Sequence, residues 1–389
     1  MSLEWVLLVF SAAVCAWYVG FRSRHSGDDF GVKKINLPRD YLVGLNFLLN
    51  EEQDKAVDVF IKMLEVDSDT VETHLAVAKL FRKRGEVDRA IRIHQNLIAR
   101  PQLEKIYREQ SLYELGQDYL SAGVLDRAER IFIELADTKE FSIRALKALL
   151  DIYQQEKSWE NAIKAAQRLA SLTKQNMDAM IANQYCELAE NLFSEGQIDA
   201  AHRALKDALS SNRNCARASI LQAKIEMHQE NYRAALRSLK RIRYQNIAYF
   251  SEAIEPLAVC YEKLGEEEKM VRYLRKILEE FPRIPIVLIL SERIRQWKGD
   301  KVAANFVADY VRRYPSLDGL HLFLNIYLNN LEVRAKNDLL IVHGLIKKLL
   351  AEKPNYQCVS CGYSGNTLLW QCPGCRQWES VKPVHSLDT

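Results

Sequence analysis

Four cysteines near the C-terminus of this 389-residue chain are the residues best suited to chemistry. Cys358 and Cys361 form one CxxC pair, and Cys372 and Cys375 form a second, with ten residues between the pairs. Thiolate sulfur is a strong ligand for zinc and for iron, and four thiolates can surround one ion as a tetrahedron. The sequence therefore predicts one tetrathiolate-bound metal ion, zinc or iron, held by these four cysteines.

Turn-forming residues accompany both pairs. Gly362 follows the first pair, and Pro373 and Gly374 lie within the second, so each loop can point backbone N–H groups at sulfur. This arrangement resembles the paired knuckles of rubredoxin. A module of this size, 355–389 with its tail, is too small for an apolar core to hold, so we expect the metal to supply most of its folding free energy. The aromatic residues expected to form its small core are Tyr356, Tyr363, Trp370 and Trp378.

Two disulfides are the alternative use of the same four cysteines. The other cysteines of the chain stand apart and show no disulfide framework. Cys186, Cys215 and Cys260 fall in amphipathic helical patterns, where a free thiol is usually a small buried apolar residue. This cysteine usage indicates a reducing compartment and favours the metal site.

An apolar segment lies at the opposite end of the chain. Residues 5–21 carry no charge and are followed at once by Arg22 and Arg24. As a helix this segment would extend about 25 Å, nearly the thickness of a bilayer core. A secretory signal peptide is the alternative, but no Lys or Arg precedes the apolar stretch. The positive-inside rule then predicts a single-pass anchor at 1–21, a polar tether at 22–36, and a body in the cytoplasm.

Small residues recur at every fourth position within the anchor. Such a stripe allows another transmembrane helix to approach closely, although alanine is also common in such helices by chance. The predicted packing face consists of Ala12, Ala16 and Gly20.

The middle of the chain, 37–315, is an internal repeat with a period of 34 to 39 residues. The turn positions that define it are Glu51, Gly85, Gly123, Lys157, Gly196, Glu230, Gly265 and Gly299. A small or slender buried residue is expected five positions after each turn, at Ala56, Ala90, Ala128, Ala162, Ala201, Ala235, Met270 and Ala304. The pattern resembles the tetratricopeptide repeat, a helix–turn–helix unit of 34 residues. We therefore predict an all-α solenoid of about eight repeats, closed by capping helices at 316–354.

Composition and motifs argue against several functions. A net charge of +3 is too close to neutral to indicate nucleic-acid binding. The sequence has no phosphate-binding glycine-rich loop, no HExxH and no GxSxG motif, and its eight histidines are scattered singly. We therefore predict that the protein is not an enzyme.

A tetratricopeptide array offers a concave groove, lined by the first helix of each unit, that binds peptides or protein surfaces. The expected groove residues are Lys79, Arg82, Tyr113, Gln117, Arg144, Lys147, Arg217 and Lys224, with acidic residues further on at Glu252 and Glu255. This mostly basic stripe favours an acidic or mixed-charge partner. The alternative is ordinary solvated charge.

Anchor, tether, repeats and cysteine module follow one another in the order found in the lipopolysaccharide assembly protein B family, which the chain resembles along essentially its whole length. The most specific local element is CVSCGYSGNTLLWQCPGC, 358–375, whose four cysteines match the metal ligands of that family. The repeats themselves are degenerate and identify the architecture better than individual contacts.

The resemblance implies a regulatory adaptor at the inner membrane of a Gram-negative bacterium, with its body on the cytoplasmic side. Family members promote degradation of the deacetylase LpxC by the membrane-anchored protease FtsH, and a membrane-embedded lipopolysaccharide sensor opposes this degradation. An anchored adaptor would act by raising the local concentration of substrate near protease. Two alternatives stay open: a scaffold that assembles envelope-biosynthesis enzymes, and a rubredoxin-like electron carrier. The oligomeric state, a homo-oligomer included, also stays open.

Overall fold

The computed structural model describes residues 42–44, 46–47, 55, 59, 71–328 and 333–384, without the side chains of 333–338. The predicted anchor, its packing face Ala12, Ala16 and Gly20, the tether, and the first turn at Glu51 with Ala56 lie outside these residues. Among the described helices, none combines the length and the apolar character that a membrane span requires. The chain forms two compact units, Met1–Gly123 and Val124–Thr389.

The first unit contains three described helices, α4 (Val71–Lys83), α5 (Val87–Ile98) and α6 (Lys105–Ser121). Each of the three contacts both of the others. Phe81 of α4 and Ile93 of α5 meet in one buried cluster, and Leu75 and Leu97 meet in a second. This is the helix–turn–helix packing expected of a tetratricopeptide unit.

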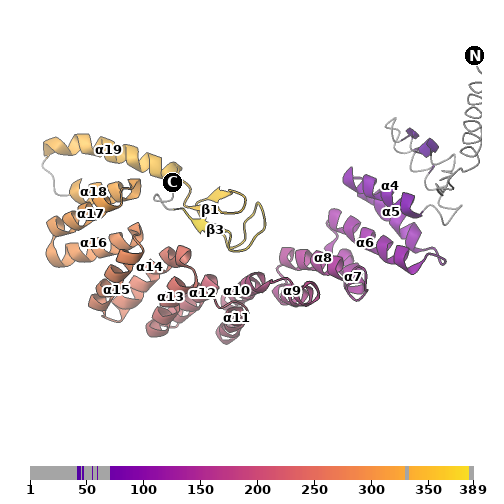
Figure 1. Ribbon diagram of the computed structural model, residues 1–389, viewed down its shortest axis with the longest axis horizontal. Coiled ribbons are helices and arrows are strands. Elements are labelled where there is room, and N and C mark those ends of the chain that lie inside the picture. The colour runs from indigo at the N-terminus through magenta and orange to yellow at the C-terminus, as the bar shows by residue number, and fades with distance from the viewer. Residues whose placement is uncertain are drawn as a thin grey trace, which may run out of the picture. The chain divides into compact units, whose positions relative to one another are not determined.

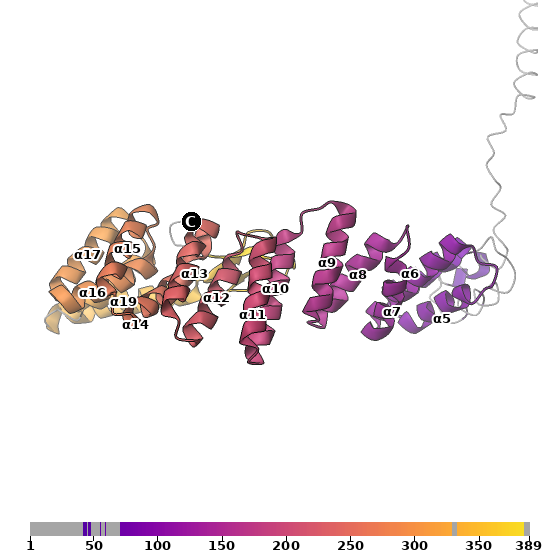
Figure 2. The same ribbon diagram turned by 90° about the horizontal axis from the view of Figure 1, so that it is seen from below.

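The second unit continues the series of helices and ends in a small sheet (Figure 1). Its helices are α7 (Leu125–Ala136), α8 (Ser142–Gln155), α9 (Trp159–Thr173), α10 (Asp178–Ser194), α11 (Ile198–Ser211), α12 (Ala216–His228), α13 (Tyr232–Gln245), the 3-10 helix η2 (Ile247–Phe250), α14 (Ser251–Lys263), α15 (Glu267–Glu280), α16 (Ile284–Lys298), α17 (Asp300–Arg313), α18 (Leu317–Leu328) and α19 (Val333–Glu352). Sequential helices pack in pairs, and Figure 2 shows α10 and α11 lying side by side. The described part of the chain is thus a mostly helical, tetratricopeptide-like solenoid with a small C-terminal module.

The seven predicted turn positions that the structure describes all have a positive φ, so the turn prediction is confirmed for them. Five are glycine, which adopts this conformation without steric penalty, and Lys157 and Glu230 adopt it at φ 57° and 58°. At five of these turns the residue after the turn donates its N–H five positions back, as in Ser158 N to Tyr153 O at 2.8 Å. This is the Schellman pattern, which satisfies the carbonyl groups at the end of the preceding helix.

The small residues expected after each turn are fully buried from Ala90 to Met270, where they let paired helices approach closely. The last prediction is wrong by one position: Ala303 is fully buried, whereas Ala304 is only partly buried. The reason is the turn before it. Helix α17 begins at Asp300, directly after Gly299, whereas the other helices begin two residues after the turn, so the buried face shifts by one residue.

The C-terminal module is a three-stranded antiparallel sheet with strand order β2 (Ser364–Gly365), β1 (Tyr356–Cys358), β3 (Val381–Pro383). Cys358 pairs with Val381, and both are buried beside Cys372. The module lies on the inner side of the curve that α10 to α14 make, and β3 contacts η2 (Figure 1). A segment at the end of the chain is therefore positioned by helices from its middle.

Candidate metal centre

The structure brings the four predicted cysteines together. Their sulfur atoms all lie within 4.8 Å of one another, and the closest pairs are Cys358 with Cys375 at 3.7 Å and Cys361 with Cys372 at 3.6 Å. Four sulfurs about 2.3 Å from one zinc ion stand roughly 3.8 Å apart along the edges of a tetrahedron. A disulfide needs about 2.05 Å, and all four cysteines are free. The geometry therefore fits one tetrathiolate-bound ion and not two disulfides.

The loops around the cysteines explain why glycine occupies two of their positions. Gly362 has a φ of 77°, and it closes the first knuckle by donating its N–H to Cys358 O at 3.0 Å. A Cβ atom on Gly374 would lie 3.3 Å from the Cys361 sulfur, which is tighter than ordinary van der Waals contact. Both glycines are therefore needed to close the loops around the four sulfurs.

Electrostatics within the cluster favours a bound cation. Hydrogen bonding with Ser380, together with backbone N–H groups, lowers the pKa of Cys358 to about 6. A backbone hydrogen bond from Tyr363 lowers the pKa of Cys361, but the three neighbouring cysteines outweigh it and raise that pKa to about 11. Like charges this close oppose each other's ionisation, so only a cation among them allows all four to be thiolates at neutral pH.

The module is fixed to the repeats by hydrogen bonds around one buried tyrosine. The hydroxyl of Tyr249, in η2, lies 3.0 Å from the carbonyl oxygens of both Glu379 and Val381. The side chain of Asn183, in α10, donates to the carboxylate of Glu379 at 3.0 Å. Burial and the charge of Glu379 raise the pKa of Tyr249, so its hydroxyl keeps the proton that it donates.

Trp370 makes the main aromatic contact between the module and the repeats. Its ring lies 4.9 Å from the ring of Tyr249 and 5.7 Å from the guanidinium of Arg217, in α12. Arg217 is only 2% exposed and forms ion pairs with Glu187 at 2.9 Å and Glu190 at 2.7 Å. Burial lowers the pKa of Arg217, but Glu187, Cys186 and Glu190 outweigh it and raise that pKa overall, so the cation is stable beneath the indole. We refer to Asn183, Arg217, Tyr249 and Glu252 as the module seat.

Two expectations need correction here. Trp370 is not part of the module's own core, because it packs on the repeats, and Arg217 is not an open groove residue, because Trp370 covers it. Tyr356 does pack in the module core, and its hydroxyl also donates to Glu252, in α14, at 2.9 Å. Cys186, Cys215 and Cys260 are free and buried, as predicted.

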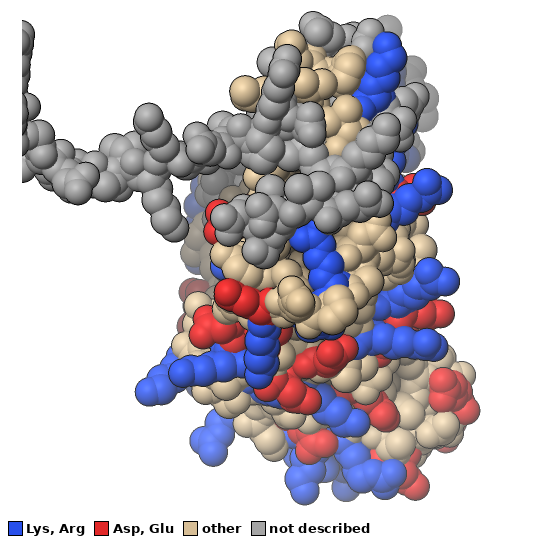
Figure 3. All heavy atoms as spheres, turned by 90° about the vertical axis from the view of Figure 1, so that its right-hand side faces the viewer, with Lys and Arg blue, Asp and Glu red and all other residues tan. Residues whose placement is uncertain are grey.

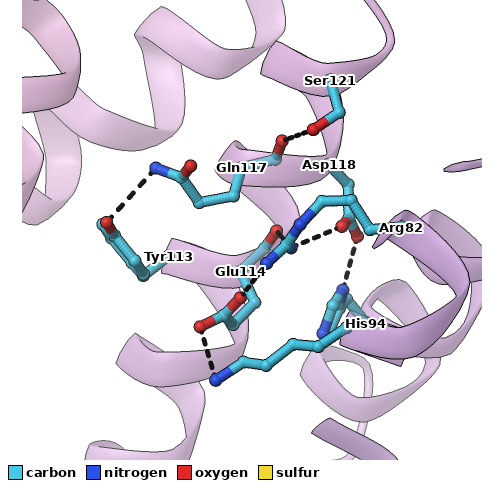
Figure 4. Close-up of polar contacts among 8 residues, drawn as sticks. Arg82, His94, Tyr113, Glu114, Gln117, Asp118 and Ser121 are labelled. Carbon is cyan, nitrogen blue, oxygen red and sulfur yellow. Dashed lines mark hydrogen bonds and ion pairs between the residues drawn. The ribbon is translucent and has the colours of Figure 1, made fainter. Parts of the chain in front are cut away.

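Two other predicted groove residues, Lys79 and Arg82, are paired with acids of the next repeat. Arg82 contacts Glu114 and Asp118, each at 2.7 Å, and Lys79 contacts Glu114 at 2.9 Å. His94, fully buried in α5, lies 2.5 Å from the second carboxylate oxygen of Asp118 (Figure 4). The positive charges of Lys79 and Arg82 are therefore balanced by carboxylates inside the first unit.

The face drawn in Figure 3 mixes basic and acidic side chains, without a large area of one sign.

The remaining predicted groove residues lie at the surface or in local contacts. Gln117 donates to the Tyr113 hydroxyl at 3.3 Å, and Arg144 lies over the ring of Phe141. Arg144, Lys147 and Lys224 are exposed. These three cations are therefore available at the surface, whereas the fourth, Arg217, is covered by Trp370.

Sequence reasoning did not identify Glu114 and Asp118 as partners of Lys79 and Arg82, although the repeat period could have indicated them. Glu114 lies 35 residues after Lys79, and Asp118 lies 36 after Arg82, about one repeat further along the chain. Opposite charges at corresponding positions of neighbouring repeats are brought together when the repeats stack. No comparable signal connected Tyr249 with Glu379, which are 130 residues apart.

Comparison with known proteins agrees with this architecture. The family described as Rubredoxin metal binding domain matches residues 356–383, and tetratricopeptide-repeat families match 73–109, 186–249 and 257–283. The chain is 38% identical, over 98% of both chains, to a protein of Escherichia coli K12 named Lipopolysaccharide assembly protein B. A protein of the same name from Haemophilus influenzae is 36% identical over 98% of both chains. The crystal structure of MamA is similar over 42% of this chain and 93% of its own, at 21% identity and a TM-score of 0.30.

Proposed function

The chain belongs to the lipopolysaccharide assembly protein B family, and we propose that it is a non-enzymatic inner-membrane adaptor that promotes FtsH-dependent degradation of LpxC. The observation that carries the proposal is the match to relatives of that name along 98% of both chains. A role in lipopolysaccharide assembly follows from the family. The protease, its substrate, the opposing membrane-embedded sensor and the single-pass anchor are the parts that we propose.

The repeats and the module suit an adaptor. Tetratricopeptide arrays bind protein surfaces through stacked helices and need no catalytic group to do so. Holding a substrate beside an anchored protease raises their effective concentration, often by orders of magnitude, without chemistry on the part of the adaptor. The exposed cations Arg144, Lys147 and Lys224 are available to an acidic or mixed-charge partner surface.

The metal has a structural task in this proposal. Cys358, Cys361, Cys372 and Cys375 would hold one zinc or iron ion, which crosslinks the two knuckles of a module too small to fold on a core alone. Once folded, the module presents Trp370, Tyr356 and Glu379 to the module seat. Loss of the metal should therefore release the module from α10, α12 and η2.

The test is the half-life of LpxC after a block of translation. It would be measured with the protein present, after its depletion, and after complementation with Cys372→Ser or with Val359→Ala. Val359 is a matched control because it lies between two of the ligands in the same module and is 69% exposed. We expect depletion to lengthen the half-life, and the wild type and Val359→Ala, but not Cys372→Ser, to restore it. An unchanged half-life on depletion would contradict the adaptor and favour a scaffold for envelope-biosynthesis enzymes.

A further inference from the structure

A hollow of about 600 Å³ lies among α11, α12 and α13, apart from the metal module. Its lining includes His202, Lys206, Ser210, Arg213, Gln222 and Arg241. Among the described residues that line it, none carries a carboxylate. Three cationic side chains and a histidine therefore converge on one concave surface with no acid among them.

Arg241 is partly buried, and its surroundings differ from those of Arg82 and Arg217. Burial lowers the pKa of both Arg82 and Arg217, but carboxylates in direct contact outweigh it and raise the pKa of each. For Arg241 burial prevails and the pKa is lowered, because the charge of Glu226 opposes it only weakly. Its hydrogen bonds go to neutral groups, from Nε to Ser219 Oγ at 3.0 Å and from Nη2 to Gln222 Oε1 at 2.8 Å. Arg241 is thus held in place with its charge largely unbalanced.

The neutral partners of Arg241 are themselves fixed. Ser219 donates to Gln245 at 2.6 Å, and Gln222 donates to Glu226 at 3.1 Å. The guanidinium therefore has a defined orientation before any ligand arrives, and preorganisation of this kind strengthens binding by reducing the loss of side-chain entropy. In the described part of the chain, Nη1 of Arg241 has no hydrogen-bond partner, so it can donate into the hollow.

The hollow lies on the opposite side of α12 from the module seat. Gln222 faces the hollow and Arg217 contacts Trp370 of the module. Five residues along a helix turn a side chain by roughly 140°, so these two residues point away from each other. The metal module does not cover the hollow, which is a separate surface of the second unit.

We propose that this hollow binds the phosphate or diphosphate group of a small molecule. A guanidinium offers a planar fork of donors that matches phosphate oxygens, and an ammonium adds a compact positive charge. Lys206, Arg213 and Arg241 supply both kinds of group, and His202 adds a further ring nitrogen. The volume lies in the range of small-molecule sites, and a bounded, mostly polar hollow suits a compact anion better than an extended acidic peptide.

The experiment is calorimetric titration of the full-length protein, purified in detergent with its metal, with inorganic pyrophosphate at low ionic strength. We expect saturable binding that Arg241→Gln weakens by about tenfold or more, as for loss of a charge-assisted hydrogen bond. Lys206 is exposed, so Lys206→Gln tests the same site without disturbing the hydrogen bonds of Arg241. Arg130→Gln and Lys164→Gln remove the same charges from exposed positions outside the hollow and should leave binding unchanged.

Further ligands distinguish the sources of the phosphate. Dihexanoyl phosphatidic acid that binds more tightly than glycerol 3-phosphate would assign the site to a lipid headgroup, and equal or weaker binding would assign it to a soluble phosphate ester. Either result supports the proposal if Arg241→Gln and Lys206→Gln weaken the binding of the phosphate ligand. Absence of saturable binding, or binding that neither variant alters, would overturn it. A hexaglutamate peptide that binds as tightly as pyrophosphate would overturn the phosphate assignment in favour of acidic peptides.

Discussion

Arg82 in the first unit and Arg217 in the second are used in different ways although their surroundings are similar. Arg217 is buried and Arg82 is partly buried, and each forms ion pairs with two carboxylates. At Arg82 all the partners belong to neighbouring repeats, with Asp118 and His94 fully buried behind it. At Arg217 the indole of Trp370 covers the guanidinium, and that indole belongs to the metal module.

The two arginines differ in what must be folded before their contacts can form. The contacts of Arg82 join residues 32 and 36 positions apart, so they form whenever two consecutive repeats stack. The contacts of the module seat join residues 104 to 196 positions apart, so they form only when the four-cysteine module is itself folded. The first unit should therefore be independent of the metal, whereas the module seat should respond to it.

The largest expected effect is that of removing a metal ligand. Cys372→Ser should reduce bound metal from about one ion per chain to almost none and remove on the order of 10 kcal/mol from the stability of the module. Hydrogen exchange at α12 and η2 should then accelerate, while exchange at α4 to α6 stays unchanged. Cys260→Ala, which alters a buried thiol outside the module, should leave the metal content as it is. Continued protection of η2 without metal would contradict the dependence.

Arg82→Met should have the next largest effect, and on the other unit. It leaves Glu114 and Asp118 buried without their main cation, which typically costs about 3–5 kcal/mol. The opening free energy of α4 to α6, from hydrogen exchange, should fall by about that amount while exchange in the module stays unchanged. Lys79→Met is the control, because Lys79 is 38% exposed and its ion pair is worth less than about 1 kcal/mol. Equal losses for both variants would show that burial does not govern this cluster.

Trp370→Ala separates the folding of the module from its docking. The indole makes one ring contact and one cation–π contact with the seat but binds no metal, so the variant should retain its ion. We expect docking to weaken by about 2 kcal/mol, since such aromatic and cation–π contacts each contribute roughly 1 kcal/mol. Elemental analysis would report the metal, and hydrogen exchange at η2 would report docking. Loss of the ion together with the contact would mean that the two processes are inseparable.

The repeats were predictable from the sequence because their determinants are local. A turn needs a residue that tolerates positive φ, and the spacing of Gly85, Gly123 and Gly196 recorded that need directly. The cysteine knuckles were predictable for the same reason, since each pair lies within four residues. The shift from Ala304 to Ala303 was missed because it depends on the single residue by which one turn is shorter.

The module seat could not be predicted because its residues have no common sequence pattern. Asn183, Arg217, Tyr249 and Glu252 come from α10, α12, η2 and α14, and in sequence each resembles an ordinary polar residue on a repeat helix. Trp370 was assigned to the module core because no local feature identified its partner Tyr249, far away in the chain. The docking of the module on the repeats is determined by complementary shape and by buried polar pairs. Neither leaves a periodic pattern in the sequence.

The smallest expected effect is a difference in pH dependence: the stability of the first unit and the docking of the module should change in opposite directions with pH. Burial raises the pKa of Glu114, but hydrogen bonds from Lys79 and Arg82 outweigh it, so that pKa lies below its usual 4.5. Ionised Glu114 therefore stabilises the first unit, and this contribution is lost as the pH falls through its folded-state pKa. Burial also raises the pKa of Glu252, and there the single hydrogen bond from Tyr356 does not outweigh it. Ionised Glu252 therefore costs docking free energy, and this cost grows as the pH rises from 4.5 through its folded-state pKa.

Glu252→Gln tests this contrast, because the amide keeps an acceptor for the Tyr356 hydroxyl but cannot ionise. At pH 7.5 the variant should dock more tightly than the wild type, and the difference should shrink as the pH is lowered through the folded-state pKa of Glu252 and the carboxylate takes up its proton. Docking would be measured by hydrogen exchange at η2 in both proteins at each pH. Because any loss of metal at low pH affects both proteins equally, the difference between them reports Glu252 alone. Glu255→Gln changes the same charge three residues further along α14 and should show no such trend. If Glu252→Gln instead loosened the module at pH 7.5, the hydrogen bond to the carboxylate would outweigh the cost of burying it, and Glu252 would stabilise the seat as Glu114 stabilises the first unit.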